Sequence, residues 1–148
     1  MENAALLIWQ YIRQNRVVSF TTQKGENLWS ANAFYTVDEQ TASLVILTGT
    51  HTGHGKMLLE NPHVSGTISS QQEDIDQLKG IQFVGTMQIQ PEDQASRAFE
   101  LYCQKFPIAK NKKETVWQLR FSTIKYTDNS LGFGTKLYWE EKRKTQKL

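Results

Sequence analysis

The chain has 148 residues, of which 39% are hydrophobic and 22% charged, and its formal net charge is +2. These values are typical of one globular domain, and so small a charge argues against a nucleic-acid partner. A single cysteine, Cys103, excludes an internal disulfide and fits a reducing cytoplasm. Because no apolar run can span a bilayer and no signal peptide is recognisable, we expect a cytoplasmic protein with no membrane partner.

The first third of the chain predicts a helix and then three strands. Asn3 can cap a helix that continues to about residue 15 with apolar residues at helical spacing. Residues 17–23 and 28–37 are rich in β-branched and aromatic side chains, which favours a hairpin with a turn between its strands. The unbroken apolar run within residues 43–48 predicts a strand that is covered on both faces.

The remaining elements alternate between strands and two further helices. Residues 80–90 give the clearest strand pattern, because apolar and polar side chains alternate along them. Pro91 is well placed to open a helix, which Pro107 ends. The other expected elements are a short helix over residues 56–60 and strands over residues 63–69, 117–121 and 137–139.

This order of elements predicts a mainly β (α+β) fold. Most strand connections are too short for parallel crossovers, so the sheet should be antiparallel, and closure would remove its edges. We therefore expect a barrel with flanking helices, forming one domain over residues 1–140. Residues 141–148 form a polar C-terminal tail, which we interpret as a solvated terminus rather than a binding arm.

The usual catalytic and metal-binding motifs are absent from the sequence. There is no nucleophile motif, and no phosphate-binding loop or dinucleotide motif of the standard spacing. The glycines of residues 132–136 are interpreted as a tight turn. His51 and His54 lack the paired short spacings of a zinc site, so we predict no metal. Catalytic residues remain unassigned.

The segment over residues 48–56 is the most informative part of the chain. It is rich in threonine and glycine and lies between an apolar strand and a helix. Backbone N–H groups of residues 53–55 at the helix start could bind a phosphate, with Lys56 or a protonated His54 adding charge. Alternatively, the segment is a connection whose threonines cap the helix. Composition does not separate these two interpretations.

Four segments, over residues 1–35, 46–64, 79–86 and 125–136, carry a resemblance to a known family. With them the chain resembles pyridoxamine 5′-phosphate oxidase-like proteins of the FMN-binding split-barrel superfamily, and especially a short, uncharacterised bacterial branch. The resemblance implies a six-stranded antiparallel split β-barrel with flanking helices. It also implies a homodimer, with FMN at the subunit interface.

The resemblance also implies which residues bind the cofactor. The strand that runs beside the flavin ring would include Ala31, Asn32 and Ala33, where many family members carry a basic residue and this chain does not. Gln82 lies on a strand that commonly faces the cofactor. The residues that match the phosphate-binding loop are Thr48, Thr50, Thr52, His54 and Lys56.

Two classes of function follow from the sequence. The first is an FMN-binding protein that acts as an oxidoreductase on an unknown small molecule, with the flavin supplying the redox chemistry. The second is a non-catalytic binding module of the same fold, which holds flavin, haem or another flat ligand or has lost its cofactor. The missing basic residue on the strand motivates the second.

Overall fold

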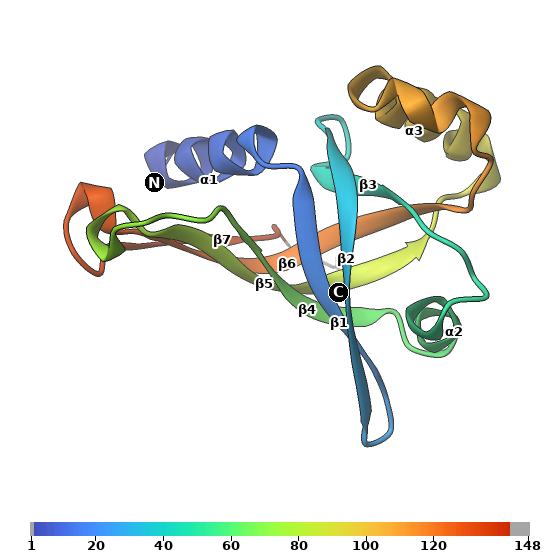
Figure 1. Ribbon diagram of the computed structural model, residues 1–148, viewed down its shortest axis with the longest axis horizontal. Helices are drawn as coiled ribbons and strands as arrows, with labels where there is room; N and C mark the ends of the chain where they lie inside the picture. Colours follow the sequence, from blue (N-terminus) through green and yellow to red (C-terminus); the bar gives the residue numbers. More distant parts are fainter. Residues whose placement is uncertain (1, 143–148) are drawn as a thin grey trace, which may run out of the picture.

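The computed structural model describes residues 2–142 (Figure 1). Within these residues, three helices lie around a strongly bent sheet, and short 3₁₀ turns occur in the loops. The helices are α1 (Glu2–Gln14), α2 (Gly53–Glu60) and α3 (Glu92–Lys105), and the 3₁₀ turns are η1 (Ile75–Gln77), η2 (Pro107–Asn111) and η3 (Asn129–Leu131). The strands are β1 (Val17–Lys24), β2 (Asn27–Asp38), β3 (Ser43–Leu47), β4 (His63–Ser69), β5 (Lys79–Ile89), β6 (Val116–Asp128) and β7 (Lys136–Glu140).

The described strands form one antiparallel sheet that closes on itself. Their order is β3-β2-β1-β4-β5-β6-β7, and β3 also pairs with β6, so that six strands form a ring and β7 extends it on β6. The predicted mainly β, antiparallel fold is confirmed. Seven strands occur among residues 2–142 where the family resemblance implied six, because β7 lies outside the ring.

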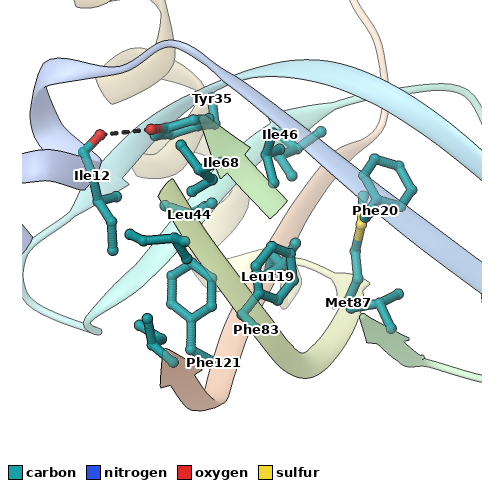
Figure 2. Close-up of a cluster of buried hydrophobic side chains, with 14 of the residues drawn as sticks. Ile12, Phe20, Tyr35, Leu44, Ile46, Ile68, Phe83, Met87, Leu119 and Phe121 are labelled. Carbon is teal, nitrogen blue, oxygen red and sulfur yellow. Dashed lines mark hydrogen bonds between the residues drawn. The ribbon is translucent and has the colours of Figure 1, made fainter. Parts of the chain in front are cut away.

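The main core fills the inside of this ring (Figure 2). Alternate residues of the strands point inward, and the large side chains of Phe20, Tyr35 and Trp117 are almost fully buried. Helix α1 closes one end with Ile8 and Ile12, and the Tyr35 hydroxyl donates a hydrogen bond of 2.6 Å to the Ile12 carbonyl. Burial of this kind is the main source of stability in a domain of this size.

A second, smaller core lies outside the ring, between α3 and β3. It contains Val45 of β3, Tyr102 of α3 and Ala109 of η2. An ion pair of 2.6 Å between Arg97 of α3 and Asp38 at the end of β2 fixes the helix there. Burial alone would raise the pKa of Asp38, but the hydrogen bonds and charge of Arg97, together with hydrogen bonds from Thr41 and Gln40, outweigh it and hold that pKa below its usual range.

Several predicted boundaries were wrong for identifiable reasons. Helix α1 already includes Glu2, so Asn3 lies inside it and is not its cap. Helix α2 begins at Gly53 rather than at residue 56, because Thr52 caps it. Strand β6 continues to Asp128, since residues that suit a turn instead pair with β5 and β7.

The C-terminal end of the described chain stays attached to the sheet. Glu141 donates its backbone N–H to the Ser122 carbonyl at 3.0 Å, and its carboxylate pairs with Arg120. The rest of the predicted tail, residues 143–148, lies outside the described residues. None of the described helices has both the length and the apolar character needed to cross a membrane.

Candidate functional site

The loop between β3 and α2 is fixed to the sheet at its first residue. The indole Nε1 of Trp117 donates to the Thr48 carbonyl at 2.8 Å, and the Thr48 N–H donates to the Thr115 carbonyl at 3.2 Å. Trp117 is itself buried in the main core. The buried position of Trp117 therefore determines the direction in which the loop leaves β3.

The side chains of two predicted phosphate donors are used by the loop itself. The Thr52 hydroxyl donates to the Gly49 carbonyl at 2.8 Å and accepts from the Gly55 N–H at 2.9 Å. The Thr48 hydroxyl forms a hydrogen bond of 2.6 Å with Nε2 of His54. The capping interpretation is therefore confirmed for Thr52. A ligand would have to use other donors of the loop.

The first turn of α2 retains donors that no described residue uses. The N–H groups of Gly53 and His54 donate to no partner among residues 2–142, nor does the hydroxyl of Thr50. No acidic residue lies in this first turn, and the side chain of Lys56 is exposed. Unpaired N–H groups and the positive end of the helix dipole favour an anion at this position.

His54 does not supply the positive charge expected from the sequence. Its ring meets the buried ring of Phe20 edge-on, with 5.5 Å between centroids and an interplanar angle of 84°. Burial lowers the pKa of His54 below its usual value of 6.5, so the imidazole is mainly neutral at pH 7. Lys56 is then the cationic side chain of the α2 first turn.

Strand β2 changes its partner along its length. Residues 27–34 pair with β1, and residues 35–38 pair with β3. The Tyr35 N–H donates to the Arg16 carbonyl, so the backbone groups of Tyr35 point toward the side of β1. Because these directions alternate along an antiparallel strand, the backbone groups of Ser30, Asn32 and Phe34 point away from β1. Along residues 27–34, the edge of β2 that faces away from β1 has no strand beside it in the described part of the chain, and we call it the open edge.

Trp29, which sequence reasoning missed, connects this open edge with α2. Trp29 is 59% exposed although it is the third residue of β2. A methyl group added to Gly53 would lie 3.9 Å from Nε1 of Trp29, which places the indole beside the first residue of α2. The sequence did contain a signal for Trp29, because it is an aromatic residue on the strand that the resemblance places beside the flavin.

The other predicted strand residues point to opposite faces of the sheet. Ala31 and Ala33 point inward and pack, partly buried, against the main core. Asn32 points outward and bonds to Ser19. Gln82 also points outward but lies three strands from β2, about 14 Å across the sheet. The chain thus brings the loop residues together near β2, whereas Gln82 is not part of that group.

Comparison with other proteins identifies relatives of this chain. No protein-family profile matches it. Proteins named UPF0306 from Yersinia pseudotuberculosis and Yersinia pestis are 40% identical over 134 residues, which cover 90% of this chain and 91% of each relative. The chain belongs to the UPF0306 family. Within residues 2–142 of this UPF0306 protein, no group of three or more His, Cys, Asp or Glu side chains could hold a metal ion.

Solved structures share the split-barrel type of fold that the resemblance implied. A haem-binding protein from Mycobacterium smegmatis has a TM-score of 0.77 and 18% identity, covering 93% of this chain and 57% of the other. An FAD-binding protein from Mesorhizobium loti has a TM-score of 0.68 and 13% identity, covering 92% and 94%. A Listeria innocua protein named as a candidate pyridoxamine 5′-phosphate oxidase has a TM-score of 0.63 and 17% identity, covering 80% and 93%. At these identities the shared feature is the fold.

Proposed function

We propose that this UPF0306 protein binds FMN, with the phosphate at the start of α2 and the flavin ring along the open edge of β2. The observation that carries this proposal is the juxtaposition of unused N–H groups at Gly53 and His54 with the exposed indole of Trp29. A helix start that faces an exposed aromatic ring suits a ligand with a phosphate at one end and a flat ring at the other.

The phosphate end of the proposed site relies on few charges. The backbone N–H groups, the Thr50 hydroxyl and the ammonium group of Lys56 are the donors available. Asn32 stands on β2 where the resemblance to FMN-binding split-barrel proteins leads us to expect a basic residue, and its side chain is already bonded to Ser19. Because charge-assisted hydrogen bonds are roughly twice as strong as neutral ones, we expect the affinity for FMN to be modest.

The ring end of the proposed site combines stacking with backbone hydrogen bonds. The indole of Trp29 offers an exposed aromatic surface, and the backbone of Ser30 and Asn32 offers donors and acceptors to the polar edge of a flavin. Bound flavin would supply the redox chemistry of an oxidoreductase, while this chain binds and orients it. That a structural neighbour is named as FAD-binding is consistent with this proposal.

We also propose that the protein is a homodimer. The cross-strand row Asn32, Ser19, Thr67 and Gln82 runs over the outer face of β2, β1, β4 and β5, with exposed Val84 beside it. A second copy on this face would cover the exposed valine and allow Gln82 to take part in an interfacial site. Light scattering tests this proposal, and a monomer at high concentration contradicts it.

Calorimetry with FMN and riboflavin tests the cofactor proposal, because the two ligands differ only in the phosphate. FMN should bind at least about tenfold more tightly than riboflavin. Lys56→Gln should weaken FMN binding about fivefold and leave riboflavin binding unchanged. The control Lys24→Gln removes a lysine that pairs with Glu60 at 2.8 Å, and it should change neither affinity. Equal binding of both ligands, or binding of neither, would overturn the proposal.

Haem is a second candidate ligand, favoured by an exposed histidine in the same loop. The ring of His51 lies against Gly49, where an added methyl group would come within 2.5 Å of it. Histidine is a common axial ligand of haem iron, and one structural neighbour is named as haem-binding. Titration with haemin should then give a Soret shift that His51→Ala abolishes. An unchanged shift in that variant would exclude His51 as a ligand.

A further inference from the structure

A separate cavity opens outside the ring, where α3 and η2 meet the ends of β2 and β3. Its volume is about 390 Å³, and its apolar lining includes Phe34, Leu47, Tyr102, Phe106 and Ile108. We call it the aromatic pocket. No side chain of this pocket is assigned to the FMN phosphate or ring above, so the pocket needs an explanation of its own.

The walls of the aromatic pocket are fixed by contacts between rings. Phe34 of β2 meets Phe106 edge-on at 5.4 Å between centroids, and Tyr102 meets Phe106 at 5.0 Å. Lys105 supports this wall, because its ammonium group lies 5.6 Å from the Phe106 ring centroid and donates to the Asn15 carbonyl. The apolar surface is therefore pre-formed, as small-molecule sites usually are.

The wall remains open to solvent at its edge. Phe34 is 54% exposed and Ile108, on η2, is 76% exposed. Because the pocket is concave and rimmed by polar residues, this exposed apolar surface is better explained by a ligand than by chance.

The rim of the pocket carries a net positive charge. Lys112 and Lys113 line it, and neither takes part in an ion pair among residues 2–142. Glu114 is the acidic residue of the lining; its carboxylate accepts a hydrogen bond of 3.0 Å from the N–H of Thr115 and offsets one of the two positive charges, so the lining keeps a net charge of +1. The pocket therefore combines an apolar aromatic interior with two available ammonium groups.

We propose that the aromatic pocket binds a small planar aromatic carboxylate. Its ring packs on Phe34, Phe106 and Ile108, and its carboxylate meets Lys112 and Lys113 at the rim. The volume lies in the range of small-molecule sites and suits one or two fused rings. Opposite charge at the rim selects an anion over a neutral ring of the same shape. This site stands independently of FMN binding.

The test uses 2-naphthoate and 2-naphthamide as probes, which share two rings and differ in charge. Binding to the full-length protein is followed by NMR shifts of its backbone amides. Shifts at Phe34, Phe106 and Ile108 are expected with naphthoate. Replacing both rim lysines, in Lys112→Gln with Lys113→Gln, should weaken naphthoate about tenfold and leave naphthamide unchanged.

Two further variants make the experiment specific. Lys110→Gln removes a nearby exposed charge that does not line the pocket, and it should change naphthoate binding less than about twofold. Ile108→Ser removes exposed apolar surface without disturbing the core, and it should weaken both probes about threefold or more.

Several outcomes overturn this proposal. These are the absence of shifts in the pocket, an equal loss of naphthoate binding in Lys110→Gln, or no effect of Ile108→Ser. If light scattering shows a dimer and the pocket gives no shifts, a second copy covers it and the small-molecule site is excluded. FMN titration of the same sample reports separately on the site at α2.

Discussion

The two halves of β2 are built from one strand but behave as different kinds of surface. The closed half, residues 35–38, pairs with β3, holds Tyr35 inside the main core and ends in the Asp38–Arg97 ion pair. The open half, residues 27–34, pairs with β1 alone and exposes Leu28, Trp29 and Phe34. In Figure 1 the open half belongs to a hairpin that projects beyond the rest of the sheet.

This difference gives one strand a part that stabilises the fold and a part that is available for the binding we propose. The closed half contributes apolar burial and satisfied hydrogen bonds, which stabilise the closed ring of strands. The open half retains backbone donors and acceptors, and an exposed indole beside the start of α2. A rigid scaffold that leaves one edge unpaired is a suitable place for a ligand, because the neighbouring residues are already positioned.

The largest expected effect comes from removing packing on the closed half. Ile46 of β3 is fully buried opposite Tyr35, so Ile46→Ala should lower the free energy of unfolding by about 3 kcal/mol. Leu28→Ala on the open half is the matched control, since Leu28 is 63% exposed, and it should change that free energy by no more than about 0.5 kcal/mol. Urea unfolding measures both. A large loss with Leu28→Ala would show that another copy covers the open half.

Two glycines of α2 should respond oppositely to the same substitution. A methyl group on Gly55 would lie 2.3 Å from the Gly49 carbonyl oxygen, so Gly55→Ala should destabilise the protein by about 2 kcal/mol and weaken FMN binding. On Gly53 the same group has ordinary contact distances, and Gly53→Ala should stabilise by up to about 1 kcal/mol through helix propensity. Thermal unfolding and FMN calorimetry measure these effects. Similar losses in both variants would contradict the described loop.

Much of the fold could be predicted from local patterns. The alternation of residues 80–90 predicts β5, and Pro91 marks where α3 begins, because these signals depend on neighbours in sequence. Ring closure depends instead on β3 pairing with β6, in which Ser43 lies opposite Arg120. No local pattern encodes a pairing between residues so far apart in the sequence. The sequence therefore supported ring closure only through the general rule that exposed sheet edges are unfavourable.

The position of the candidate site in the sequence could be predicted, but the contacts of its side chains could not. The threonine and glycine composition indicated residues 48–56, and the helix start lies there. That Thr52 and Thr48 use their hydroxyls within the loop depends on side-chain geometry. The same holds for the burial of His54 against Phe20 and for Trp29 beside Gly53, since each joins residues more than 20 positions apart.

A smaller effect should come from the hydrogen bond that joins the closed half to α1. Tyr35→Phe leaves the Ile12 carbonyl without its partner and should cost about 1.5 kcal/mol at pH 7. Burial also raises the pKa of Tyr35 well above its usual value of 10.0. The unfolded state therefore releases this proton first, and stability should fall as the pH rises above about 10. Chemical unfolding against pH should show a shallower alkaline decline for Tyr35→Phe, and an unchanged decline would contradict this account.

The smallest effect concerns His54, beside the open half. Because burial lowers its pKa in the folded state, the unfolded chain binds this proton more readily. The contribution to stability is therefore complete above about pH 6.5 and declines as the pH falls below that value. His54→Gln, which can still bond to Thr48, should flatten the decline between about pH 7 and 5. If the decline is the same in this variant as in the original protein, His54 is solvated in the folded protein, and its charge must then be counted among the groups that meet a phosphate at α2.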